Sequence, residues 1–164
     1  MVDVFQKHLI LSNIFPTFNQ MKKLLPLLLL ILIGCSKDDG PYKDYYPNGK
    51  VRGEGTFKNN KVEGLFTTYY DEGQILKEFQ FRDGKRNGKM NWYYKNGNLK
   101  VLGYYKDDKQ DGPFKSYYEN GQLEGEGTYK DGIKDGPYKE YYDDGKLKKE
   151  ETYKNGKLIY SKEY

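Results

Sequence analysis

Apolar and polar residues alternate along most of this chain, in short stretches separated by turns that contain glycine. From Leu123 to Tyr129 the odd positions are apolar or small and the even positions are polar. A period of two is typical of a β-strand that packs on one face, so we expect the odd positions to share that face. A similar stretch at 112–118 and the Glu-Asn-Gly-Gln sequence at 119–122 complete a predicted β-hairpin.

The turns of this hairpin follow from their residue types. Asn120-Gly121 predicts a tight turn with positive φ at both central residues. The segment 130–136 contains two Asp-Gly pairs, which are typical of turns, and leads the chain into the next hairpin. Glycine recurs too often for a helix, since each copy inside one costs about 1 kcal/mol. The chain is therefore predicted to be all-β.

The hairpin pattern recurs with a period of 24 residues, five times between Tyr45 and Tyr164. Each unit has a tyrosine pair, a glycine, an aliphatic residue and a later aromatic residue. The tyrosine pairs are Tyr45/Tyr46, Tyr69/Tyr70, Tyr93/Tyr94, Tyr117/Tyr118 and Tyr141/Tyr142. A fixed period in this range indicates a repeat architecture. Because one hairpin is marginally stable in water, we expect stacked hairpins that form a continuous sheet.

Small residues on the packing face predict where aromatic rings lie. Gly125 and Gly127 leave space above the backbone for rings from a neighbouring strand. We expect the tyrosine pairs and rings of the Tyr129 series to fill that space. Aliphatic residues are scarce in the repeats, so these rings must bury most of the apolar surface, at about 150–250 Å² each.

The repeated sequence resembles a known family. The pattern Gly-x-[Trp/Phe/Tyr]-x-x-Tyr-Tyr-x-Asn-Gly-x-Leu-x-x-x-Gly-x-Tyr-x-[Asp/Asn]-Gly is similar to the MORN repeat in its bacterial variant, and covers Gly40 to Tyr164. The resemblance implies an elongated, single-layer antiparallel sheet of stacked β-hairpins. We assign 41–164 to this repeat domain, with five 24-residue units from 45 that follow a half unit. Tyr160 replaces an expected glycine and predicts an end cap.

The N-terminal region has the pattern of a targeting segment. Met21 is followed by two lysines and an apolar run from Leu24 to Ile33. The run is shorter than the about 20 residues of a membrane-spanning helix, and its flanks are those of a signal peptide. Its end, Leu-Ile-Gly-Cys35, resembles a bacterial lipobox, in which the cysteine is lipid-modified. We expect a lipoprotein signal peptide at 21–34 and lipidation at Cys35.

The segments on either side of the signal peptide complete the domain assignment. Residues 1–20 do not resemble the start of a signal peptide, so we interpret them as an upstream extension that is absent from the mature protein. Residues 35–40 form the lipidated cysteine and a short tether. The charged sequence Ser36-Lys37-Asp38-Asp39 resembles the export signal of surface lipoproteins. The expected location is the bacterial cell envelope, as an outer-membrane lipoprotein on either its periplasmic face or the cell surface.

Charge and composition limit the function classes. The full chain has a net charge of +4, but the signs alternate and form no basic stripe, so we predict no nucleic-acid partner. Its one histidine, His8, precedes the repeats, which removes the commonest general base and metal ligand from them. Repeated carboxylates such as Glu124 and Glu126 do not mark one copy as catalytic. We expect no catalytic residues, no metal and no cofactor.

A calcium site is the alternative interpretation of the acidic segment 107–112. This segment lacks the spacing of a twelve-residue calcium loop with a closing glutamate. The equivalent segments of other units have turn residues, including Asn59-Asn60 and Asp83-Gly84. We therefore interpret it as a turn.

Positions that break the repeat are the candidates for a specific function. Trp92 is the only tryptophan and stands where the other units have Asp, Thr, Ser or Glu. Aromatic residues are enriched at protein interfaces, although Trp92 also fits the role of filling a gap in its own unit. The predicted binding patch comprises Trp92, Met90, Tyr93, Tyr94, Phe79 and Tyr104. Leu102 and Tyr160 also break the repeat.

These observations favour a non-enzymatic, lipid-anchored envelope protein that acts as a protein-binding or scaffold module. The expected partner is a protein, and the membrane is contacted through lipid on Cys35. An alternative is an envelope glycan or lipid-headgroup binding module, with sugars on tyrosine rings or phosphates on basic residues. An antitoxin-like or immunity protein is a third hypothesis, which fits poorly with a secretion signal. An enzyme is a further alternative.

Overall fold

The computed structural model describes residues 39–164, and the signal peptide, the extension and Cys35 lie outside them. The described chain forms one antiparallel sheet of twelve strands. The strands are β1 (Gly40–Tyr45), β2 (Val51–Lys58), β3 (Lys61–Tyr69), β4 (Ile75–Arg82), β5 (Lys85–Tyr93), β6 (Leu99–Lys106), β7 (Lys109–Gln110), β8 (Gly112–Tyr117), β9 (Leu123–Lys130), β10 (Ile133–Tyr141), β11 (Leu147–Lys154) and β12 (Lys157–Glu163).

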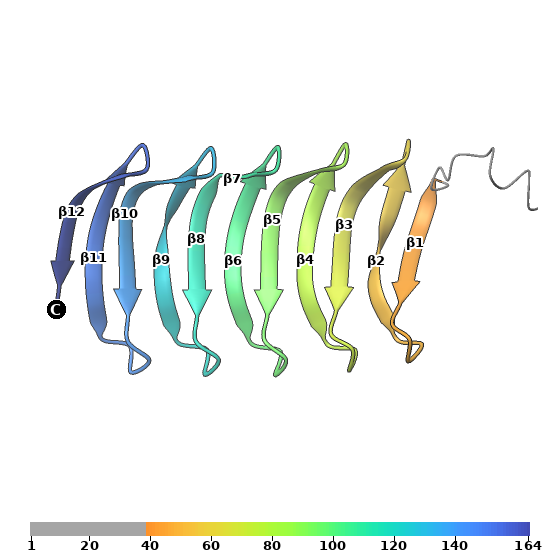
Figure 1. The fold of residues 1–164 in the computed structure, drawn as a ribbon, viewed down its shortest axis with the longest axis horizontal. Helices are drawn as coiled ribbons and strands as arrows, with labels where there is room; N and C mark the ends of the chain where they lie inside the picture. Colours follow the sequence, from red (N-terminus) through yellow and green to blue (C-terminus); the bar gives the residue numbers. More distant parts are fainter. Residues whose placement is uncertain (1–38) are drawn as a thin grey trace, which may run out of the picture. The chain divides into compact units, whose positions relative to one another are not determined.

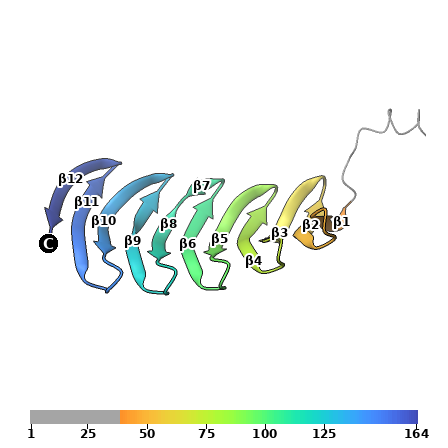
Figure 2. The same ribbon diagram turned by 60° about the horizontal axis from the view of Figure 1, so that its bottom comes forward.

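Strand order in space follows strand order in the sequence. Each strand pairs with the strands before and after it in the sequence, with one exception. The two-residue strand β7 pairs only with β6, and β8 also pairs with β6 and continues the sheet. Figures 1 and 2 show a single layer of bent strands, with the hairpin turns along two opposite edges. The predicted fold, an all-β elongated sheet of stacked hairpins, is confirmed. Within residues 39–164 there is no helix long and apolar enough to cross a membrane.

The two edges carry different turns. At the edge with the tyrosine pairs, Gly121 N–H donates to Tyr118 O and Tyr118 N–H donates to Gln122 O, each at 2.9 Å. Only Gly121 has a positive φ, of 87°, so the prediction of positive φ at both Asn120 and Gly121 is wrong. The hairpin loop has three residues, and three-residue hairpin loops need a left-handed backbone conformation only at their last residue.

Two-residue turns with positive φ at both positions occur at the other edge. Asp131 and Gly132 have φ of 52° and 90°, and β10 begins at the next residue, so the turn is shorter than the segment 130–136 that we expected. Asp107 and Asp108 form an equivalent turn, with φ of 48° and 68°. The Asp108 carboxylate accepts a hydrogen bond of 3.0 Å from Arg86 Nε. The turn interpretation of this acidic segment is confirmed.

A bulge next to each tyrosine pair changes which residues share a face. Ser116 pairs with Gly125, but the next residue, Tyr117, pairs with Leu123, so one residue of β9 is extra. Residues directly opposite in a sheet lie on the same face, and neighbours on a strand lie on opposite faces. Leu123 therefore lies on the face opposite to Gly125. The predicted grouping of all odd positions from Leu123 to Tyr129 is wrong at Leu123.

Candidate functional site

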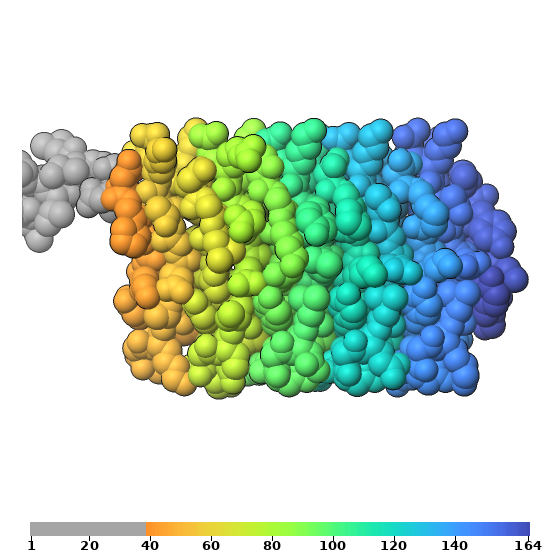
Figure 3. Space-filling view, turned by 180° about the vertical axis from the view of Figure 1, so that it is seen from behind, coloured from red at the N-terminus to blue at the C-terminus, as the bar shows by residue number. Residues whose placement is uncertain are grey.

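The sheet has two different faces, which the strand register defines. The aromatic face carries a ladder of rings along the middle of the sheet. Its rings are Tyr42, Phe57, Phe66, Phe79, Phe81, Tyr105, Phe114, Tyr129, Tyr138 and Tyr153. The other side, which we call the carboxylate face, carries the first tyrosine of each pair and a row of glutamates at 54, 78, 126 and 150. The space-filling view shows side chains of successive units side by side (Figure 3).

Rings of the aromatic ladder lie over glycines, as predicted, but they belong to a different series. A Cβ added at Gly55 would lie 2.5 Å from the Phe66 ring, and one at Gly127 would meet the ring of Tyr138. These two rings occupy equivalent positions, three repeats apart. The space that we assigned to the tyrosine pairs and the Tyr129 series is therefore filled by the series that contains Phe66 and Tyr138.

The boundary between the second and third hairpins, where β4 pairs with β5, departs from this arrangement at two compensating positions. Met90 stands where the other hairpins have a ring, and Phe79 stands where they have glycine or, at the end of the array, Glu151. Met90 and Phe79 are direct partners across β4 and β5. Met90 is buried, and the Phe79 ring packs at 6.2 Å from the rings of both Phe81 and Tyr105. Both residues thus contribute to the packing of the sheet.

Trp92 lies on the aromatic face, closer to the edge with the tyrosine pairs. The ammonium of Lys77 lies 4.2 Å from the centre of its ring, and that of Lys100 lies 4.4 Å from it. Both distances are typical of cation–π contacts. Neither lysine has a carboxylate within ion-pair distance in the described part of the chain. The indole N–H is buried and has no acceptor there.

Two of the other hairpins have an ion pair at the place of Trp92 and Lys100. In the first hairpin, Asp44 accepts two hydrogen bonds from Arg52, at 3.0 and 2.6 Å. In the fifth, Glu140 lies 4.0 Å from Lys148. The third hairpin keeps the basic residue and replaces the acid with tryptophan, while Lys77 adds a second cation. This exchange leaves two positive charges on the aromatic face that no carboxylate of the described chain neutralises.

The structure divides the predicted patch among several locations. Phe79, Met90 and Trp92 share the aromatic face. Tyr93 lies on the carboxylate face, where its hydroxyl donates to Glu78 at 2.8 Å. Tyr104 pairs with Lys89 and shares that second face.

Tyr94 is part of a ladder along the turn edge. Its hydroxyl donates to Tyr117 O at 2.8 Å, one unit further on. Four successive units repeat this bond, with donors Tyr46, Tyr70, Tyr94 and Tyr118. Burial, with smaller contributions from Glu124 and Glu119, raises the pKa of Tyr94. These bonds join adjacent hairpins, so Tyr94 has a structural role in addition to any contact with a partner.

The carboxylate face repeats a tyrosine–glutamate pair with one interruption. Tyr69 donates to Glu54, Tyr93 to Glu78 and Tyr141 to Glu126. Burial first, and then the hydrogen bond to Glu78, raise the pKa of Tyr93 to about 12. Leu102 replaces the glutamate that would serve Tyr117. Asn91, the partner of Leu102 in β5, has a buried Oδ1 without a hydrogen bond in the described residues.

Sequence reasoning identified Trp92 but not the two lysines that flank it. Lys77 precedes Trp92 by 15 residues and is its partner in the sheet. Comparison of positions 24 apart shows Lys77 in a series that also contains glycine, valine and Lys149, but it does not show that Lys77 lies against Trp92. Within residues 39–164 there is no group of three or more histidine, cysteine or acidic side chains placed to hold a metal ion.

Comparison with known proteins agrees with the hairpin frame of the structure. The family described as MORN repeat variant matches at residues 38–59, 62–83, 86–107, 110–131 and 134–155. These five segments coincide with the hairpins β1–β2, β3–β4, β5–β6, β8–β9 and β10–β11, after which β12 forms half a unit. No curated protein matches the chain. The five tandem matches cover more than half of the sequence, and the chain belongs to the MORN repeat variant family.

Proposed function

We propose that this protein is a non-enzymatic binding module of the bacterial cell envelope, anchored by lipid on Cys35. Its array of hairpins presents two open faces and is built from positions that repeat every 24 residues. Repeated positions account for the sheet itself, whereas a specific contact requires positions that differ between units. The proposed contact surface is centred on Trp92, with Lys77 and Lys100, and its partner is a protein with an acidic surface.

The uncompensated lysines on Trp92 carry this proposal. The other acid–base pairs of this edge, Asp44–Arg52 and Glu140–Lys148, are internal to the chain. At Trp92 the acidic member would come from the partner, and tryptophan is enriched at the centres of protein interfaces. A carboxylate of the partner would also be drawn to this location by the two positive charges.

Site-specific photo-crosslinking on the intact lipoprotein in cells tests the proposal. A photoreactive lysine analogue that keeps the ammonium, placed at position 77, should give one discrete protein adduct, and Trp92→Ala in the same chain should abolish it. The matched control is the same photoreactive residue at Lys89, which lies on the carboxylate face of the adjacent strand and should give no such adduct.

Other outcomes separate the remaining candidate functions. Anionic headgroups or glycans bearing phosphate or carboxylate would also be attracted to Lys77 and Lys100. Adducts to lipid or glycan at Lys77, without a protein adduct, would support the glycan or headgroup alternative. The same adducts from Lys77 and Lys89, or a protein adduct that survives Trp92→Ala, would contradict the proposed surface.

A further inference from the structure

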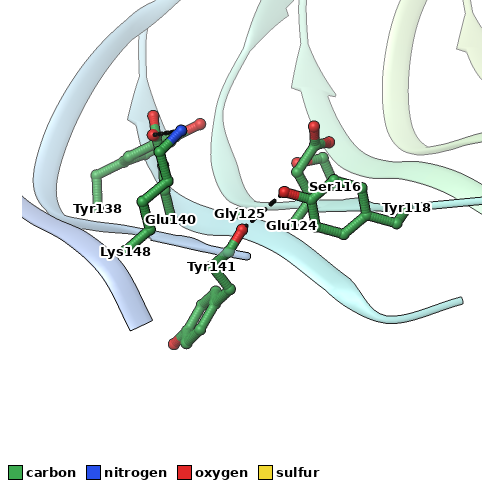
Figure 4. Close-up of a pocket in the computed structure, with 8 residues that line it drawn as sticks. All are labelled: Ser116, Tyr118, Glu124, Gly125, Tyr138, Glu140, Tyr141 and Lys148. Atoms are coloured by element: carbon green, nitrogen blue, oxygen red, sulfur yellow. Dashed lines mark hydrogen bonds and ion pairs between the residues drawn. The ribbon is translucent and has the colours of Figure 1, made fainter. Parts of the chain in front are cut away.

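A pocket on the aromatic face lies one unit beyond Trp92. It has a volume of about 250 Å³ and is lined by Ser116, Tyr118, Glu124, Gly125, Tyr138, Glu140, Tyr141 and Lys148. Figure 4 shows Ser116, Tyr118 and Glu124 on one side of Gly125, and Tyr138, Glu140 and Lys148 on the other. Two strands, β6 and β8, lie between Trp92 on β5 and Gly125 on β9, so three strand spacings of about 4.8 Å separate these residues along the sheet.

The missing side chain of Gly125 opens this pocket. Its backbone is not in the left-handed region, so the position does not require glycine for its conformation. A Cβ there would lie 3.2 Å from Ser116 Oγ and 3.4 Å from Tyr138 Oη, both of which line the pocket. A larger side chain at this position would therefore extend into the pocket volume.

Equivalent positions in other units contain lysine. Lys77 stands two units before Gly125, and Lys149 stands one unit after it. Lys77 places its ammonium against the ring of Trp92, and Lys149 forms an ion pair with the buried carboxylate of Glu151. The sheet thus accommodates a lysine side chain at this place twice, once beside a ring and once beside a carboxylate.

The pocket at Gly125 keeps both kinds of partner for such a cation. Carboxylates of Glu124 and Glu140 line it, and Glu124 forms no ion pair within residues 39–164. Glu140 is shared with Lys148, in the 4.0 Å ion pair described above, so Glu124 is the carboxylate of this pocket that has no cation in the described residues. Tyr118 and Tyr138 provide aromatic surface, and the Tyr118 hydroxyl is held by its 2.8 Å hydrogen bond to Tyr141 O (Figure 4).

We propose that this pocket binds a primary ammonium group, in the place that Lys77 and Lys149 fill in other units. The group comes from a lysine side chain of a protein or from a free alkylamine, since both present the same cation on an alkyl stem. Carboxylates and aromatic faces both stabilise such a cation. The site is separate from the surface at Trp92, which attracts the opposite charge, so either proposal stands without the other.

Titration of the full chain in detergent micelles, followed by amide NMR, tests this site. The probes are Nα-acetyl-lysine methylamide for a protein lysine, cadaverine for a free amine, and Nα-acetyl-norleucine methylamide as the uncharged control. Both amines, or one of them, should shift the amides of Ser116 and Glu140 in a saturable manner. The norleucine compound should not. A response to cadaverine alone would identify a free amine as the source.

Three variants define the result further. Glu124→Gln combined with Glu140→Gln should weaken amine binding about tenfold, because it removes both carboxylates. Gly125→Lys should abolish binding, since its own ammonium would occupy the pocket as Lys149 does in the next unit. Glu119→Gln, which removes one carboxylate outside the pocket, should bind as the unchanged protein does.

Specific outcomes would overturn the proposal. If neither amine gives saturable shifts while the spectrum shows a folded chain, the proposal is wrong. Equal shifts with the norleucine compound would indicate an apolar site instead. Unchanged amine binding in a folded Gly125→Lys protein would place the ammonium elsewhere. None of these results depends on the partner at Trp92 or on the lipid anchor.

Discussion

Phe79 and Met90 face each other across β4 and β5, and together they replace the glycine and ring of a regular unit. The regular arrangement is seen at Gly55 and Phe66, where the ring lies directly over the glycine. Between β4 and β5 the bulky ring has moved from the later strand to the earlier one. Two departures that look unrelated in the sequence are therefore one packing solution.

The effects of exchanging these two side chains on the unfolding free energy should be strongly coupled. Phe79→Gly alone removes a packed ring, at an expected cost of about 3–5 kcal/mol. Met90→Phe alone adds bulk beside Phe79, at about 1–3 kcal/mol. The double variant recreates the regular pair, so it should be at least about 1 kcal/mol more stable than the sum of the single changes predicts. Urea unfolding measures all three, and additive effects would contradict the compensation.

The hydroxyl of Tyr94 should contribute to the cohesion of the array. Tyr94→Phe removes its hydrogen bond to Tyr117 O, which should cost about 0.5–1.5 kcal/mol of unfolding free energy. Tyr142→Phe is the matched control, because the Tyr142 hydroxyl has no hydrogen-bond partner in the described chain. Thermal or urea unfolding compares the two variants. Equal effects would show that the hydroxyl ladder does not stabilise the sheet.

Leu102 should determine the effect of removing the Tyr117 hydroxyl. Tyr93→Phe breaks a hydrogen bond to the carboxylate of Glu78 and should cost about 1.5 kcal/mol or more. Tyr117→Phe should cost less than half as much, because Leu102 offers no acceptor. In a Leu102→Glu background the cost of Tyr117→Phe should rise to that of Tyr93→Phe. A double-mutant cycle by urea unfolding measures this, and a cost that is independent of residue 102 would contradict it.

Tyrosine ionisation should destabilise the protein at alkaline pH. Burial is the largest cause that raises the pKa of Tyr69, Tyr93 and Tyr138, each to about 12, whereas an unfolded tyrosine ionises near 10. The folded state favours the neutral phenol, so this stability is complete below pH 10. It is lost as the pH rises from 10 to 12.

Unfolding free energies measured across this interval check the prediction. Tyr138→Phe should make the decline with pH shallower, because it removes one of the buried groups that ionise. Tyr142→Phe again serves as control, since Tyr142 is 44 % exposed. A decline that is equally steep in Tyr138→Phe would exclude Tyr138 as a contributor.

The proposed lipid anchor predicts where the protein is found in a cell. Cys35→Ala removes the thiol that the lipid would modify, so the protein should move from the membrane pellet to the soluble fraction after cell fractionation. Ser36→Ala, at the neighbouring position, should leave the protein in the pellet. Continued pelleting of Cys35→Ala would contradict lipidation as the means of attachment.

The interpretation of residues 1–20 as an upstream extension predicts that they are absent from the protein in cells. Detection of peptides from 1–20 in the cellular protein would contradict it.

The sequence by itself determined the hairpins, their 24-residue period and their assembly into an antiparallel sheet. These features follow from local information: turn residues such as Gly121, alternation along each strand, and the need of each hairpin for a neighbour. The departure at Trp92 was also visible, because a repeat provides its own internal comparison. The contact of Trp92 with Lys77 and Lys100 was not visible, since it joins three strands.

Only the tertiary structure decided which departures meet and which face each occupies. A bulge of one residue places Leu123 on the opposite face to Gly125, because side chains alternate and an extra residue reverses all that follow. Tyr93 lies on the carboxylate face because it adjoins Trp92 on β5, and Tyr104 shares that face because it pairs with Lys89. The pocket at Gly125 likewise depends on register, because side chains from four successive strands converge there. Sequence spacing fixes the repeat, whereas strand pairing fixes the neighbours.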